Sequence, residues 1–404
     1  MLIAASELVA QFTFAIRSAL IESDTRHSLR NRDLHNASRL ANVCRTKSRK
    51  KENSVSKQLL MVGSMPLDTA SEVMETFGNP LGNFLRTIPD GEIGPRRYWV
   101  SHVHLQVFAL HPDLEILQRP RRDNGVERLY PHDDKDGWAF RVKPGVERLV
   151  FGDPGWRLAY AQDALSSYFV FRTLKEKGIL PPHIRFQVSL PMVNSVCAVR
   201  TFPTPGDLDK VRPGYTDALR AEVETITSKI PATELAIQWD LAREITEING
   251  GISGMPAEGS IERNIAQVAA LSPHIPEGVE LGYHFCFGTM GGWPRFSPKD
   301  LGATVQFANA VVQASGRRVD WVHIPLLDRV TDEFVAPLAQ LKPQGARVYL
   351  GAIHNMERFK ERIAMAKKYL PEFGVGAYCG LGRMPADQVP RVLEEHIEAS
   401  GIIS

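Results

Sequence analysis

Two residues that can bind a transition metal, His284 and Cys286, stand two positions apart in the segment HFC. In an extended strand, residues two apart point to the same face, so both side chains are expected on one side. A further cysteine, Cys379, ends a later apolar segment. One imidazole and two thiolates form a soft donor set that suits Zn²⁺. In the alternative interpretation, the cysteines are small buried hydrophobes and the histidine is a hydrogen-bonded core residue.

Other reactive side chains stand at or near the ends of the remaining apolar segments. Gly63 and Ser64 follow the first segment, Asp240 follows a central one, His323 lies within a later one, and His354 follows the next. If the segments are parallel strands of a barrel, their carboxyl ends meet at one face, where active sites of such barrels lie. We therefore expect these residues to share a pocket, although Asp240 could instead be a helix N-cap.

The segments that position these residues alternate between strand-like and helix-like patterns. Apolar runs rich in β-forming residues occupy 59–62, 184–190, 235–239, 279–286, 319–324, 347–353 and 374–379. Amphipathic stretches occupy 156–177, 215–229, 261–272, 301–314, 333–341, 356–369 and 387–399. This alternation predicts a parallel sheet covered by helices, either doubly wound or closed into a barrel.

The long, nearly continuous repetition favours the barrel, because no phosphate-binding G-x-G-x-x-G follows a strand. We predict the α/β class, with a single (β/α)₈ TIM barrel whose eighth strand lies within 90–150. The stretch 78–155 is irregular and rich in Pro, Gly, Asp and Arg. It predicts a long excursion after the first strand, and ordered loops of this length are often functional.

Composition narrows the class of partner. The chain has 404 residues, of which 48 are Lys or Arg and 46 are Asp or Glu, for a net charge of +2. This balance excludes a strongly basic nucleic-acid or membrane surface and leaves small molecules as the expected partners. The four cysteines are too scattered for a disulfide framework, which favours a reducing compartment such as the cytoplasm. No run reaches the roughly 18 apolar residues that a membrane span needs.

The first 57 residues differ in composition from the rest. A short amphipathic stretch is followed by a polar, basic one that ends near KSRKK at 47–51. Enrichment in Arg and Ser is typical of mitochondrial transit peptides, whereas the acidic residues Glu7 and Glu22 are not. We therefore divide the chain into 1–57, a disordered or transit-like extension, and 58–404, the barrel. The expected location is the cytoplasm, with mitochondrial import through the extension as the alternative.

A series of short motifs over about 59–399 resembles the catalytic barrel of cobalamin-independent methionine synthase, within the superfamily it shares with uroporphyrinogen decarboxylase. The motifs, in order, are VGSMP (62–66), DGEIGPRRYW (90–99), SLPMVNS (189–195), IQWD (237–240), HFC (284–286), AIHN (352–355) and YCGLGR (378–383). The resemblance implies a zinc ion held by His284, Cys286 and Cys379.

The resemblance also implies roles for the surrounding residues. Backbone amides at Gly63 and Ser64 would receive a substrate carboxylate. Glu92 and Asp240 would bind the substrate amine, and His354 would donate a proton. From the residues alone, Arg96, Arg97 and Arg383 are further candidates for binding an anion.

This sequence departs from the family pattern at three places. Pro325 stands where the family has a glutamate zinc ligand, and proline cannot bind a metal. His323, two residues earlier and on the same face, could replace it, which gives a hypothetical site of His284, Cys286, His323 and Cys379. Alternatively, His323 is a buried polar residue and the metal site is incomplete. The aspartate of the family's D-I-H motif is Ala352 here, and the family's T-G-P turn is absent from 189–195.

The resemblance implies zinc-dependent transfer of a methyl or other alkyl group to or from a small, homocysteine-like thiol amino acid. Methyl-folate is the donor that the family implies, but the altered turn at 189–195 is compatible with another donor. Two alternatives keep the barrel. One is a decarboxylase-like or lyase-like enzyme that binds an anionic substrate through Arg96 and Arg97. The other is a binding protein without catalytic activity.

Overall fold

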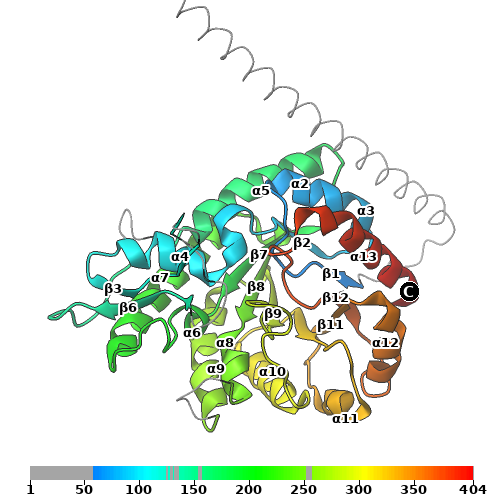
Figure 1. Cartoon of the computed structure of the whole chain (residues 1–404). Helices are drawn as coiled ribbons and strands as arrows, with labels where there is room; N and C mark the ends of the chain where they lie inside the picture. Colours follow the sequence, from blue (N-terminus) through cyan, green and yellow to red (C-terminus); the bar gives the residue numbers. More distant parts are fainter. Residues whose placement is uncertain are drawn as a thin grey trace, which may run out of the picture. The chain divides into compact units, whose positions relative to one another are not determined.

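Eight strands form one parallel sheet within the part of the chain that the structure describes. This computed structural model describes residues 58–123, 126–127, 131, 136–152, 157–251 and 257–403. The strand order is β1-β12-β11-β10-β9-β8-β7-β2. A parallel bridge between Leu59 and Leu85, with a 3.0 Å hydrogen bond from the Leu59 N–H to the Phe84 carbonyl, brings β1 back toward β2. The sheet is therefore a nearly closed barrel, which confirms the predicted fold class (Figure 1).

The strands of the sheet are short, and along most of the chain each one is followed by a helix. Their bounds are Leu59–Leu60 (β1), Thr87–Pro89 (β2), Arg185–Pro191 (β7), Leu235–Leu241 (β8), Glu280–Phe285 (β9), Trp321–Pro325 (β10), Arg347–Ile353 (β11) and Gly374–Ala377 (β12). The helices that follow them ring the sheet in Figure 1, as expected for a barrel.

The helices divide into long covering helices and short turns. The longer ones are α4 (Val100–Gln106), α5 (Tyr160–Glu176), α7 (Asp207–Lys229), α8 (Arg243–Ile248), α9 (Ser260–Leu271), α10 (Gly302–Ala314), α12 (Phe359–Lys367) and α13 (Val389–Ile403). The short ones are α2 (Ala70–Val73), α3 (Asn79–Leu81), α6 (Val193–Val196) and α11 (Asp332–Val335). Among the described residues, no helix is both long enough and apolar enough to cross a membrane.

Two boundaries differ from the sequence prediction for identifiable reasons. The eighth strand is β2 at Thr87–Pro89, just before the predicted window of 90–150, so the long excursion follows the second strand. Three residues ending in proline are too few to show a strand period. Helix α7 begins at Asp207 rather than 215, because it continues through Pro213, a residue type that normally ends a helix. The predicted extension, 1–57, lies outside the described residues.

The barrel interior is filled below its carboxyl-terminal end. Leu60, Ala236, Trp321 and Tyr349 form a buried cluster inside the sheet. Trp321 lies directly against the backbone of the neighbouring strand, since a Cβ added at Gly282 would lie 1.8 Å from the Trp321 ring. Only glycine fits there. This cluster is the floor on which the residues nearer the strand ends rest.

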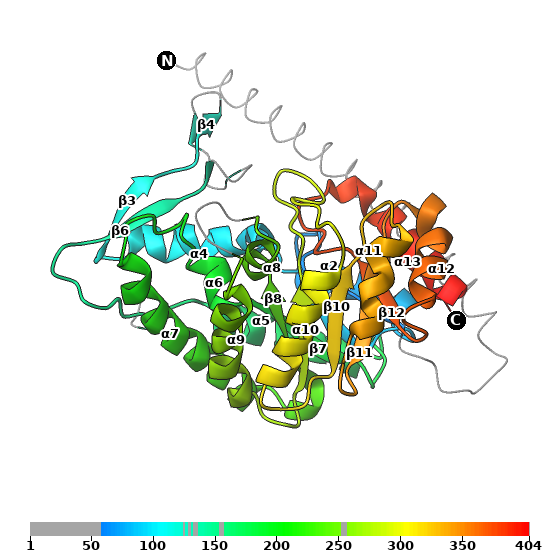
Figure 2. The ribbon, with the colours of Figure 1, turned by 90° about the horizontal axis from the view of Figure 1, so that it is seen from below.

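The excursion after β2 builds a second, smaller packing centre. It contains α4 and the antiparallel pair β3 (Leu114–Gln118) and β6 (Ala139–Val142), which extend to one side of the barrel in Figure 2. The short strands β4 (Arg122–Asp123) and β5 (Val126–Glu127) pair beyond it. Phe108 lies at its centre, with the rings of Phe140 and Tyr215 5.8 and 6.1 Å away. Because Tyr215 belongs to α7, these contacts anchor the excursion to the barrel.

Buried His104 of α4 should make the stability of this region depend on pH. Its Nε2 bonds the Val196 carbonyl at 3.1 Å, and burial lowers its pKa to about 3. The folded protein therefore keeps this histidine neutral, whereas the unfolded chain protonates it below about pH 6.5. The stability that it contributes is complete above pH 6.5 and is lost as the pH falls toward 3.

We predict that His104→Gln, which keeps a donor for Val196 but does not titrate, reduces this loss. Between pH 7 and pH 5, the free energy of unfolding of the native chain should fall by about 2 kcal/mol more than that of the variant. Urea unfolding at both pH values measures the difference. Equal losses in the two proteins would contradict the assignment.

Candidate functional site

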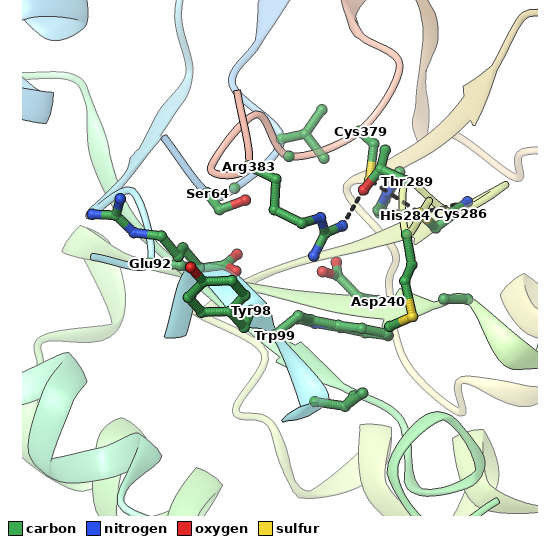
Figure 3. A pocket seen from close by; sticks show the side chains of 18 of the residues that line it. Ser64, Glu92, Tyr98, Trp99, Asp240, His284, Cys286, Thr289, Cys379 and Arg383 are labelled. Carbon is green, nitrogen blue, oxygen red and sulfur yellow. Dashed lines mark hydrogen bonds between the residues drawn. The ribbon is translucent and has the colours of Figure 1, made fainter. Parts of the chain in front are cut away.

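A pocket opens at the carboxyl ends of the strands, with about 740 Å³ of empty space when the part open to solvent is included. Its walls come from the turn after β1, the loop after β2, and the ends of β8, β9 and β12. Among the residues predicted from the sequence, those that line it are Gly63, Ser64, Glu92, Asp240, His284, Cys286 and Cys379. Arg97 and Arg383 line it as well. The structure therefore brings together most of the predicted site (Figure 3).

Three of these side chains could hold a metal ion. The donor atoms of His284, Cys286 and Cys379 all lie within 4.8 Å of one another. The two Sγ atoms are 3.1 Å apart, and both cysteines are free thiols. The Nε2 atom of His284 is buried without a hydrogen-bond partner. A buried imidazole nitrogen without a partner, beside two thiols, fits a soft divalent metal such as Zn²⁺.

The two thiols differ strongly in acidity because they share a hydrogen bond. That bond, together with nearby His284 and Arg383, lowers the pKa of Cys379 well below its usual range. The same bond and burial raise the pKa of Cys286 well above it. In the absence of metal, Cys379 is therefore a thiolate that accepts a hydrogen bond from the Cys286 thiol. A bound metal ion would displace the proton of Cys286 and take the place of this hydrogen bond.

His323 lies beside this group but does not belong to it. Its Nδ1 lies 2.7 Å from the Nδ1 of His284, and the two ring centroids are 4.8 Å apart. The ring is fully buried, and burial lowers its pKa well below 6.5. The sequence hypothesis placed His323 on the metal in place of the glutamate missing at Pro325. The structure instead engages one of its ring nitrogens with the predicted ligand His284.

Two buried carboxyl groups face the thiols across the pocket. Asp240 lies in β8, and its Oδ1 accepts a 2.8 Å hydrogen bond from Gln238. It is not a helix N-cap, because α8 begins at Arg243 with Ala242 as its cap. Burial raises the pKa of Glu92 to about 8. Burial and then the neighbouring Glu92 raise the pKa of Asp240 well above its usual value.

Backbone and amide groups fix where these carboxyl groups lie. The Val62 carbonyl accepts hydrogen bonds from Gln187 at 3.0 Å and from Gln238 at 2.8 Å, which ties the end of β1 to β7 and β8. Glu92 packs directly over Gly63, since a Cβ there would lie 2.4 Å from the Glu92 Oε1. Gly63 is therefore needed to admit the carboxyl group, in addition to any role of its backbone amide.

Arg96 holds the loop that carries Glu92 and does not line the main pocket. Its Nη2 pairs with Asp90 at 2.7 Å and its Nε with Asp163 at 3.1 Å. Asp90 in turn accepts the backbone N–H of Glu92 at 2.9 Å. Arg96, which the sequence offers as a contact for an anionic substrate, is thus paired with acidic residues of the protein in this structure. Arg96 instead borders a smaller adjoining cavity that Glu92 also lines.

His354, predicted as a proton donor, also lies outside the lining of the pocket. Its Nε2 bonds the Leu326 carbonyl at 2.9 Å, and its ring packs edge-on against Tyr378 at 5.4 Å. Burial lowers its pKa to about 4, so the ring is neutral near pH 7. In this arrangement His354 is a neutral ring bonded to a backbone carbonyl, and its role as a proton donor stays a prediction.

Several pocket residues were not predicted individually from the sequence. Trp99 lines the pocket from an unusual backbone conformation with φ of +55°, and Thr289 and Arg295 come from the glycine-rich loop after β9. Arg383, one of the anion candidates, hydrogen-bonds to Thr289 across the opening. Figure 3 shows Arg383, Glu92 and Asp240 directed into the same space. The mouth is therefore cationic while the interior is acidic and sulfur-rich.

Fold and site together define a class: a parallel (β/α)₈ barrel with a His/Cys/Cys group in the pocket at its carboxyl-terminal face. No protein-family model matches the chain, and no curated protein matches its sequence.

Two of the solved structures to which the chain is similar share little sequence identity with it. One is a B12-independent methionine synthase from Shewanella sp. W3-18-1 in complex with selenomethionine, with a TM-score of 0.48, 14% identity, and coverage of 79% of this chain and 82% of that one. The other, assigned as a vitamin-B12-independent methionine synthase from Listeria monocytogenes, has a TM-score of 0.47, 14% identity, and coverage of 83% and 84%. At identities this low, an assignment of function has to rest on the side chains of the pocket.

We predict that Glu92 titrates near pH 8 in the metal-free protein. At pH 6 it should be a neutral carboxylic acid, and at pH 9.5 a carboxylate, because burial disfavours the charge. Infrared difference spectra between these pH values should contain a protonated-carboxyl band that is lost in Glu92→Gln. An unchanged band in that variant would show that another group carries the proton.

Proposed function

We propose that this protein is a zinc-dependent enzyme that transfers a methyl or other alkyl group to or from the sulfur of a small amino-acid thiol. The observation that carries the proposal is the convergence of His284, Cys286 and Cys379 in a pocket that also contains two buried carboxyl groups. Catalytic zinc sites use three protein ligands and leave the fourth position for substrate. Three donors therefore suffice, and the glutamate replaced by Pro325 is not required.

The donor set favours thiol chemistry over hydrolysis. A thiol that coordinates zinc is deprotonated, and two protein thiolates would leave such a substrate sulfur electron-rich. When bound, the ion would thus supply a thiolate nucleophile at neutral pH. The residues of the chain would bind and orient the substrate so that its sulfur lies near the thiols and its alkyl donor lies toward the mouth.

The charges of the pocket match the two ends of an amino acid. Asp240 and Glu92 are buried in the same pocket as the thiols and would bind the ammonium group. Ser64 and the cationic Arg383 would bind the carboxylate. Because burial raises the pKa of both acids, binding of an ammonium group would drive a proton off this pair. Binding of the substrate to these two acids would therefore be coupled to release of a proton.

We predict that the purified protein binds about one zinc per chain. Cys286→Ala and Cys379→Ser should each lose the metal, because two remaining ligands bind zinc far more weakly. Cys197→Ala is the matched control, since Cys197 is also a buried free thiol but lies outside the pocket. Zinc content and chelator competition measure the result.

A native chain without zinc would contradict alkyl transfer. It would leave the two alternatives, an enzyme that binds an anionic substrate through Arg96 and Arg97, or a binding protein. Metal retained in both cysteine variants would show that zinc binds elsewhere.

We further predict selectivity for an amino thiol. Cobalt-substituted protein should show a new sulfur-to-metal absorption when homocysteine is added. Asp240→Asn should weaken this binding about 10- to 100-fold, as expected for loss of a charged hydrogen bond. The des-amino analogue, mercaptobutanoate, should bind the native and variant proteins equally. Equal losses for both thiols would assign Asp240 to the metal centre instead of the ammonium group.

A further inference from the structure

We propose that His323 is a positioning residue that holds His284 in the orientation and tautomer that bind a metal through Nε2. The inference rests on the proposed function, because it concerns the same metal centre. It gives His323 a role different from that of a fourth ligand. The observations that carry it are the direct contact of the two imidazoles and the burial that fixes both rings.

The contact follows from strand register. His284 of β9 and His323 of β10 are paired residues on neighbouring parallel strands, so both side chains enter the barrel at the same level. Their Nδ1 atoms lie 2.7 Å apart, within hydrogen-bond distance. Neither ring is more than 1% exposed. Solvent therefore cannot replace His323 as the partner of His284.

The hydrogen bond between the two rings determines their tautomers. A neutral imidazole has one N–H and one lone pair, and a metal takes the lone pair. Binding through the unpartnered Nε2 of His284 requires the N–H to be on its Nδ1, where an acceptor must receive it. The Nδ1 of His323 is that acceptor. His323 must then carry its own proton on Nε2, which is buried and, like the Nε2 of His284, has no hydrogen-bond partner among the described residues. Metal-binding histidines are commonly held by such a partner, and its loss typically costs 10- to 100-fold in metal affinity.

The surrounding backbone keeps the His323 ring in this place. A Cβ at Gly351 of β11 would lie 3.1 Å from its Cε1, and a Cβ at Gly376 of β12 would lie 3.6 Å from its Nε2. Two glycines on adjacent strands thus leave a slot that the ring fills. The Nε2 edge of His323 lies at Gly376, while its Nδ1 edge meets His284. His323 is also absent from the group of donor atoms that lie within 4.8 Å of one another, which fits a support for His284 better than a metal ligand.

The first test uses ¹¹³Cd²⁺ as a spectroscopic substitute for zinc in the full-length protein labelled with ¹⁵N-histidine. One histidine, His284, should show metal–nitrogen coupling, and it should do so through Nε2. His323 should show no coupling and should carry its proton on Nε2. Coupling of cadmium to both histidines would overturn the inference and support the four-ligand site instead. A proton on Nδ1 of His323 would also overturn it.

The second test measures Cd²⁺ affinity by chelator competition. His323→Leu removes the acceptor and should weaken binding 10- to 100-fold. His323→Asn places a carbonyl oxygen near the position of Nδ1 and should restore much of the affinity. His396→Asn is the matched control, because His396 is equally buried with an unpartnered Nε2 but lies on α13. It should bind normally.

The outcomes separate the two proposals. If the native chain binds neither zinc nor cadmium, the proposed function fails and the role of His323 fails with it. If the native chain binds metal and His323→Leu binds it equally well, only the role of His323 is overturned. If His323→Leu does not fold, the labelling experiment on the native chain still decides, because it requires no variant.

Discussion

The pocket depends on one constraint, the return of β1 to both β12 and the segment before β2. β1 is only two residues long, and its ladder to β12 holds Leu59 and Leu60. Closure nevertheless places the turn at Gly63 and Ser64 opposite the ends of β8 and β9. Without it, Cys379 after β12 and Glu92 after β2 would lie at the two edges of an open sheet. The side chains of Gln187 and Gln238 strengthen this junction by bonding the Val62 carbonyl.

Concentrating so many polar groups in one buried place opposes folding. Two carboxyl groups, two thiols and an imidazole nitrogen without a partner are all withdrawn from water in this pocket. Each costs free energy unless it is paired, and the raised pKa values of Glu92 and Asp240, caused first by burial, express that cost. Proteins tend to retain such arrangements where they bind or react with something. The core of the rest of the barrel is mostly apolar, and its burial offsets this local loss of folding free energy.

Much of this could be predicted from sequence, and the reason is periodicity. His284 and Cys286 point the same way because strand residues alternate, and a parallel barrel gathers strand ends regardless of loop detail. The partners of individual side chains could not be predicted. His323 contacts His284, His354 bonds a backbone carbonyl, and Arg96 pairs with two aspartates. Each of these contacts depends on residues that other strands or loops bring close. β2 was missed since three residues carry no period.

The buried cluster beneath the pocket determines how ligands can reach the site. It consists of Leu60, Ala236, Trp321 and Tyr349. Because this cluster fills the barrel beneath the pocket, the described pocket has no rear exit at that level. A ligand that reaches the sulfur atoms would therefore enter from the carboxyl-terminal side of the barrel, and a molecule bound beside the sulfur atoms would lie beneath any second molecule in the pocket.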